Sequence, residues 1–185
     1  MALREILTEP NKLLRAKSLT VEKVDEGLQK LMNDMLETMY AAPGIGLAAI
    51  QVGVPKRVIV LDIGWRNKSE SIDDEKQVVR KNPMYFVNPE IITKSTNNST
   101  YEEGCLSVPG QFAEIERPDK CHIKYLDYYG QPKELVAEDM LATCIQHEID
   151  HLEGILFIDY LSKLKKSMIV KKLLKQKEQL DRIVI

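Results

Sequence analysis

The residues ATCIQHEIDHLEG, Ala142–Gly154, predict both a central helix and a chemical site. They contain His-Glu-x-x-His, in which His147 and His151 are one helical turn apart, so that both imidazoles project from one face of a helix. Two histidines at this spacing bind a divalent metal, and Glu148 between them can accept a proton from a metal-bound water. A catalytic site normally has three protein ligands and one open position. The third ligand must therefore come from another part of the chain.

The third ligand is expected upstream of the helix. No histidine follows His151, and beyond Glu153 the only glutamate is Glu178, which lies among lysines. Upstream, the stretch EEGCLSVPG contains Cys105 just before a turn. Taken alone, such a cysteine is often a packed thiol. A thiolate is also a strong ligand of zinc or iron(II), and a Cys-His-His set leaves the fourth position open.

A third segment with chemical potential is GIGLAAIQ, Gly44–Gln51. One interpretation is a glycine turn that packs closely on the core beside small alanines. The neutral amide of Gln51 suggests more, because it can donate a hydrogen bond to a developing oxyanion without competing as a metal ligand.

The composition favours one soluble globular domain over residues 1–185. The chain is 44% apolar and 29% charged, with a net charge of −2, and no apolar run approaches the roughly 20 residues of a membrane span. The start, MALREILTEPNK, has charges where a signal peptide is apolar, so we expect a cytoplasmic protein. Three cysteines without C-x-x-C spacing support neither a disulfide framework nor a four-cysteine zinc site.

Helical periodicity predicts a first helix over about Val21–Tyr40, with Thr20 as a possible cap and Pro43 at its end. A second helix is predicted over about Glu138–Leu152, stopping at Gly154. Its chemical face and its apolar face are both expected to be buried, the first with Met140, Cys144, His147 and His151 and the second with Leu141, Ile145, Ile149 and Leu152.

The middle of the chain is predicted to be mainly strands. RVIVLDI, Arg57–Ile63, is typical of a buried strand, and Cys121–Ala137 is typical of a hairpin that turns near Gly130. The polar stretch Gly64–Pro83 between them is interpreted as a surface loop. Together with the helices, these strands predict one α+β domain.

In this order, GIGLAAIQ, EGCLS and QHEIDHLEG resemble the three signature motifs of the peptide deformylase family, which removes the formyl group from newly made polypeptides that begin with formyl-methionine. The resemblance implies antiparallel sheets that surround the helix carrying His-Glu-x-x-His, with a C-terminal helix over about 162–185. It also implies Fe²⁺ as the natural metal, with Zn²⁺, Ni²⁺ or Co²⁺ able to substitute, whereas the ligand types alone favour zinc equally.

Carried over position by position, the resemblance implies a complete site. The metal ligands would be Cys105, His147 and His151, with Glu148 as general acid/base. Gln51 and the backbone N–H of Leu106 would form the oxyanion hole. The substrate would be bound by Gly44, Ile45, Gly46, Tyr101, Met140, Thr143 and Cys144.

Predictions can also be made for three side chains outside this set. Phe112 stands where some relatives have an arginine that contacts the substrate backbone, which leaves the contacts beyond the first two substrate residues open. Arg117 is expected to pair with Asp150 in support of the helix, or to form a solvent-exposed salt bridge. His122 is expected on the surface.

The C-terminal tail, Ser162–Ile185, is basic. It has eight basic and two acidic residues, a net charge of +6, whereas the rest of the chain carries −8. Lysines spread this widely are usually a solvated helix face, but similarity to family members whose C-terminal helix docks near the nascent-chain exit implies ribosome binding. We expect Met168, Ile169 and Leu173 to pack on the domain. No membrane or DNA partner is expected.

Two alternatives use the same helix. A metal-dependent peptidase or amidase of other specificity would have a pocket for larger acyl groups. A non-catalytic module would close the fourth metal position with a protein ligand, and would need neither Gln51 nor Glu148.

Overall fold

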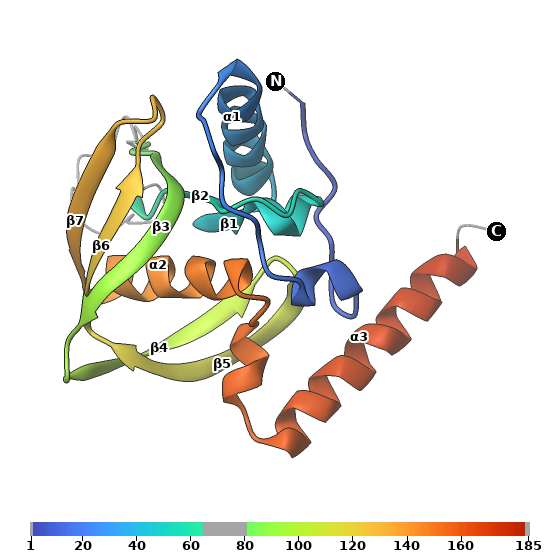
Figure 1. Cartoon of the computed structure of the whole chain (residues 1–185). Helices are drawn as coiled ribbons and strands as arrows, with labels where there is room; N and C mark the ends of the chain where they lie inside the picture. The colour runs from blue at the N-terminus through green and yellow to red at the C-terminus, as the bar shows by residue number, and fades with distance from the viewer. Residues whose placement is uncertain (1, 65–80, 184–185) are drawn as a thin grey trace, which may run out of the picture.

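The computed structural model describes residues 2–64 and 81–183, and side chains as far as residue 179. Figure 1 shows the order of its elements. They are η1 (Lys12–Arg15), α1 (Glu26–Ala41), β1 (Gly46–Ala48), η2 (Ala49–Val52), β2 (Val58–Leu61), β3 (Met84–Lys94), β4 (Asn98–Cys105), β5 (Val108–Pro118), β6 (Lys120–Leu126), β7 (Pro132–Glu138), α2 (Asp139–Leu152), η4 (Phe157–Tyr160) and α3 (Lys163–Ile183). None of the helices in these described ranges is long and apolar enough to cross a membrane.

The helix α2 lies between two antiparallel sheets, as Figure 1 shows. One sheet has the strand order β1-β2-β3-β6-β7, and the other pairs β4 with β5. This arrangement confirms the predicted α+β fold with a central helix and a C-terminal helix.

The strand β2 explains how the core is layered. Its four residues are all fully buried, because helices cover both faces of the sheet at this point. Ile59 and Leu61 pack with the apolar side of α2, whereas Val58 and Val60 pack with the methionines of α1. Side-chain alternation along one short strand therefore joins two helices.

The first helix begins later than predicted, at Glu26 rather than Val21. Asp25 caps it by accepting a hydrogen bond from the N–H of Leu28 (2.8 Å). The backbone N–H and C=O of Val21 instead pair with the side chain of Asn88, both at 2.8 Å. This distant pairing holds Val21 out of the helix, so Thr20 does not cap it.

The other predicted elements are confirmed with small changes at their ends. The buried strand is Val58–Leu61, and the hairpin of β6 and β7 turns at Gly130, whose φ is 79°. The helix α2 starts one residue later than expected, and Gly154 follows its end with φ 76°. Residues 65–80, most of the predicted surface loop, lie outside the described residues.

The C-terminal helix is confirmed and packs through only part of its predicted apolar face. Leu173 is buried, and the partly buried Ile169 and Val170 join it against a cluster that includes Phe157 and Ile158. Met168 is 63% exposed. The expectation that Met168 packs on the domain was therefore wrong, because it lies on the side of α3 that faces away from this cluster.

The buried carboxylate of Asp62 holds two chain positions that are far apart in sequence. Its Oδ1 accepts the N–H of Gly64 (3.0 Å), and its Oδ2 accepts the N–H of Asn82 (2.9 Å) and the hydroxyl of Tyr40 (2.5 Å). Burial and this hydrogen bond raise the pKa of Tyr40. Gly64 and Asn82, on either side of residues 65–80, are thus fixed on one side chain.

The N-terminal segment runs along α1 and is attached to it by Asp34 (Figure 1). This buried carboxylate accepts the N–H of Ala2 (3.0 Å) and pairs with Lys30 (3.0 Å) and Arg4 (3.2 Å). The Ala2 N–H first, then Lys30 and Arg4, lower the pKa of Asp34 to about 2, even though burial opposes the shift.

We predict that Asp34 makes the protein sensitive to acid. Because its folded-state pKa lies below 3.8, its contribution is complete above that pH and disappears as the pH falls toward about 2. This contribution is roughly 2 kcal/mol at neutral pH, since one pKa unit is worth about 1.4 kcal/mol. Denaturant unfolding of the wild type and Asp34→Asn should give a difference in unfolding free energy that is constant near neutrality and shrinks on acidification. A pH-independent difference would contradict the prediction.

Candidate active site

The structure brings together the three predicted metal ligands. Cys105, at the end of β4, faces His147 and His151 of α2, and one ligand atom from each lies within 4.8 Å of the others. The Cys105 Sγ is 3.2 Å from His151 Nε2. A thiolate and two imidazoles converging in this way fit a four-coordinate divalent metal with one position left open.

His147 is oriented by a carboxylate that the sequence analysis missed. Glu103 Oε2 lies 2.8 Å from His147 Nδ1, so Nε2 is the ring nitrogen that is left for metal binding in the cluster of Cys105, His147 and His151. Arg117 holds Glu103 with two hydrogen bonds, Nε to Oε1 (2.5 Å) and Nη2 to Oε2 (3.1 Å). Burial would raise the pKa of Glu103, but the hydrogen bonds with His147 and Arg117 lower it.

Arg117 also makes the predicted pair with Asp150. Its Nη1 donates to Asp150 Oδ2 (2.8 Å), and Tyr160 donates its hydroxyl to the same oxygen (2.8 Å). Since Arg117 is only 4% exposed, the pair supports the helix from inside, and the alternative of a solvent-exposed salt bridge is wrong. His122 pairs with Glu134 on the exposed side of the hairpin, as its expected surface position requires.

The two histidines differ in their electrostatics. Burial would lower the pKa of His147, but its hydrogen bonds to Cys105 and Glu103 raise it well above the usual value. Burial, followed by the charges of His147 and Arg117, lowers the pKa of His151 well below it. A bound cation would take the place of the proton on His147, as imidazole ligands require.

Glu148 is buried beside the backbone of β1. Burial raises its pKa to about 7, and its Oε2 has no hydrogen-bond partner among the described residues. A Cβ on Gly46 would lie 2.3 Å from Glu148 Oε1, so only glycine leaves room for the carboxylate. A buried carboxylate oxygen without a donor is costly, and it fits a role in receiving a proton.

The amide of Gln51 is held in one orientation. Its Oε1 accepts the N–H of Ala48 (2.8 Å), while its Nε2 donates to Ser107 Oγ (3.0 Å) and lies 3.6 Å from Cys105 Sγ. The donor end of the amide therefore faces the cluster. Leu106, between Cys105 and Ser107, borders the same space.

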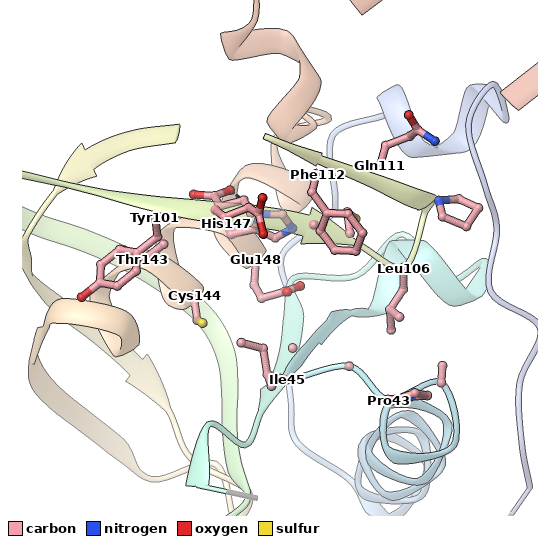
Figure 2. A pocket seen from close by; sticks show the side chains of 18 of the residues that line it. Pro43, Ile45, Tyr101, Leu106, Gln111, Phe112, Thr143, Cys144, His147 and Glu148 are labelled. Atoms are coloured by element: carbon pink, nitrogen blue, oxygen red, sulfur yellow. Dashed lines mark hydrogen bonds and ion pairs between the residues drawn. The ribbon is translucent and has the colours of Figure 1, made fainter. Parts of the chain in front are cut away.

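A cavity of about 540 Å³ contains almost all of the predicted site residues. Figure 2 shows Tyr101, Thr143, Cys144 and Ile45 on one side of Glu148, and Leu106 and Phe112 on the other. The predicted substrate residues Gly44, Ile45, Gly46, Tyr101, Met140, Thr143 and Cys144 all line it. His151, the remaining residue of the cluster, is buried, with 1% exposure.

Phe112 forms part of the cavity rim and is 64% exposed. It pairs with Gly104 across the two-stranded sheet, and a Cβ on Gly104 would lie 2.5 Å from its ring. The ring therefore covers Gly104 and gives the cavity rim an aromatic surface.

Two supporting residues were missed although the sequence contained a signal for each. Glu103 lies two residues before Cys105 in a strand, so strand alternation places both side chains on one face. Ser107 follows Cys105 at the same spacing and is fully buried. Neither signal points to Tyr160, which reaches Asp150 from the separate element η4.

The chain matches known proteins over nearly its whole length. A model of the polypeptide deformylase family matches residues 3–167. A peptide deformylase of Pelagibacter ubique is 62% identical over 185 residues, all of both chains, and one of Maricaulis maris is 56% identical over 98% of both. The crystal structure of peptide deformylase from Ehrlichia chaffeensis in complex with actinonin has a TM-score of 0.85 at 43% identity, covering 95% of this chain and 98% of that one. The chain therefore belongs to the polypeptide deformylase family, the metal-dependent hydrolases that remove the N-terminal formyl group from polypeptides.

Proposed function

We propose that Cys105, His147 and His151 hold the metal of this deformylase. Residues 1–185 are proposed to form one catalytic domain. The observation that carries the metal proposal is the convergence of the three residues' ligand atoms beside Glu148, whose Oε2 has no hydrogen-bond partner in the described part of the chain. When bound, the cation would supply Lewis acidity, lowering the pKa of a water and polarising the formyl oxygen. No fourth protein ligand lies in this cluster among the described residues, which disfavours a purely structural site.

Fe²⁺ is proposed as the natural metal, with Zn²⁺, Ni²⁺ or Co²⁺ able to substitute. One thiolate and two imidazoles suit iron(II) and zinc alike, so the choice rests on the family resemblance. Loading the metal-free protein with each ion under anaerobic conditions and comparing kcat/KM would test it. Only the iron form should lose activity rapidly in air, because iron(II) and its thiolate ligand both oxidise.

Glu148 is proposed as the general acid/base. It would accept the proton of the attacking water and later deliver it to the amine that leaves with the peptide. Its burial and its raised pKa support both halves of this transfer, because a carboxyl group that is nearly balanced between its two forms at neutral pH can take up a proton and release it.

The amide of Gln51 and the N–H of Leu106 are proposed to stabilise the negative charge that develops on the formyl oxygen. The fixed orientation of Gln51 supports this role, because no reorganisation is needed when the charge appears. A hydrogen-bond donor of this kind is worth roughly 10²–10³ in rate.

The substrate is proposed to be a nascent polypeptide with N-terminal formyl-methionine. Its flexible, apolar side chain suits the part of the cavity between Ile45, Tyr101 and Cys144. The backbone near Ile45 would pair with the extended peptide like an added strand. Release of formate from formyl-methionyl peptides, measured beside N-acetyl and unblocked peptides, tests this specificity. Equal cleavage of the acetyl peptide would favour an amidase of broader specificity.

The protein is proposed to be cytoplasmic. Its basic helix α3 is proposed to contact the ribosome near the nascent-chain exit. The lysines at 171, 172, 175 and 177 are exposed, while Leu173 between them is buried. One side of the helix thus packs on the domain and leaves positive charge available for RNA phosphates.

Replacing Lys171, Lys172, Lys175 and Lys177 by glutamine should weaken ribosome binding and make it less dependent on salt, because fewer counterions are released. Deformylation of short peptides should stay unchanged. The matched control replaces four exposed lysines outside α3, Lys23, Lys56, Lys94 and Lys133, and so removes the same charge. Co-sedimentation with ribosomes over a salt series measures both variants. Equal affinity of the α3 variant and the wild type would reject the proposal.

A further inference from the structure

The two proposed oxyanion donors stand on separate parts of the fold. Gln51 lies in η2, directly after β1 of the five-stranded sheet, whereas Leu106 lies in the turn between β4 and β5. Among the described residues, no strand pairing joins the two sheets. An oxyanion hole needs its donors held to within about 0.5 Å. Other contacts must therefore fix the distance between these two elements.

The N-terminal segment crosses between the two elements. The N–H of Leu7 donates to the carbonyl oxygen of Gln51 (2.7 Å), and the N–H of Glu9 donates to the carbonyl oxygen of Ser107 (2.8 Å). Two N–H groups that are two residues apart therefore bind one acceptor on each element. We call Leu7–Glu9 the strap.

The strap closes a ring of hydrogen bonds. Gln51 and Ser107 are also joined directly, because Gln51 Nε2 donates to Ser107 Oγ (3.0 Å). Both of these side chains are buried, with exposures of 1% and 0%. The donor amide, the turn that contains Leu106 and the strap are thus connected by three hydrogen bonds, two of which come from the strap.

The strap is itself anchored at both ends. On one side, the N–H of Arg4 donates to Thr38 Oγ1 on α1 (3.0 Å). On the other, Arg15 pairs with Glu9 (3.2 Å) and with Asp159 (2.5 Å). Figure 1 shows the segment descending from α1 past η2 to η1. A segment held at both ends can resist movement of the two elements that it joins.

We propose that the strap is a positioning element for catalysis, which sets the spacing of the two oxyanion donors through the N–H groups of Leu7 and Glu9. The proposal rests on the proposed role of Gln51. Because these donors stabilise charge that is present only in the transition state, loosening the strap lowers kcat and leaves KM nearly unchanged.

Leu7→Pro tests the strap, because proline lacks the N–H that binds Gln51. We expect kcat to fall roughly tenfold, a part of the 10²–10³ that loss of a whole donor causes. KM and metal content should remain unchanged. Leu7→Ala controls for the lost side chain. Glu5→Pro controls for proline in the same segment, at an exposed residue whose N–H bonds to no described group. Both controls should keep kcat within about twofold of the wild type.

An amide-to-ester exchange at Leu7 provides a second variant if the proline form does not fold. It replaces the N–H by oxygen and keeps the side chain and the shape of the backbone. It should reproduce the same selective fall in kcat. An ester variant with wild-type kcat would overturn the proposal.

A double-mutant cycle with Gln51→Ala separates positioning from general destabilisation. If the strap acts through Gln51, its loss should have little further effect on kcat once the amide is gone. An equal loss from the Leu7 change in both backgrounds would reject the strap while leaving the role of Gln51 intact. If Gln51→Ala alone leaves kcat unchanged, the proposed oxyanion role fails instead.

Discussion

Glu148→Ala should lower kcat by roughly 10²–10⁴, which is the usual range for the loss of a general acid/base. The variant should keep one metal ion per chain. In the sequence Glu148 lies between His147 and His151, the two proposed histidine ligands, but it does not belong to their cluster, and its Oε2 is buried without a hydrogen-bond partner among the described residues. Removing it therefore removes proton transfer and leaves the three ligands in place. Elemental analysis beside a formate-release assay measures both quantities.

Two companion variants sharpen this test. Glu148→Gln keeps the shape of the side chain and should be nearly as inactive, because an amide cannot accept the proton. Glu134→Ala is the matched control, since Glu134 also pairs with a histidine, His122, but on the exposed hairpin. A Glu148 variant that loses its metal, or one that turns over at a near-normal rate, would show that the assigned role is wrong.

Cys105→Ser should lower metal affinity by at least about tenfold, and activity should fall with occupancy. The serine hydroxyl is not ionised at neutral pH and is a harder donor than a thiolate, so the soft bond to the metal is lost. Metal content after dialysis against a weak chelator measures the effect. Added metal should restore part of the activity, because His147 and His151 remain.

The competing view of Cys105 is a covalent nucleophile, for which the same change would abolish activity without changing occupancy. Cys121→Ser is the matched control, because Cys121 is a buried thiol in the five-stranded sheet, away from the cluster. It should keep its metal even if its stability falls. A formyl thioester trapped on Cys105 of the wild type would exclude the ligand-only role.

The parts of the site that could be predicted are those that follow from the spacing of residues close together in the sequence. His147, Glu148 and His151 follow from the helical repeat, and Cys105 follows from the need for a third ligand. Glu103 was missed because adjacent glutamates usually face water. Strand alternation turns Glu103 inward and Glu102 outward, and the pairing with His147 and Arg117 compensates for burying the charge of Glu103.

The error at the start of the first helix was caused by a contact between residues that are far apart in the sequence. The apolar repeat continues upstream of Glu26, so the sequence favours a helix from Val21, but the side chain of Asn88, 67 residues away, takes the backbone bonds of Val21. The strap depends in the same way on two backbone N–H groups, which any sequence supplies. Contacts of this kind leave no pattern in residue type or spacing.

The position of Asp62 has a consequence for how this chain can change in length. Gly64 and Asn82 donate to the same buried carboxylate, so the two stems are closed before any intervening residue contributes. A variant that changes the length of the chain between Gly64 and Asn82 therefore has to keep the carboxylate of Asp62, because this one side chain holds both stems.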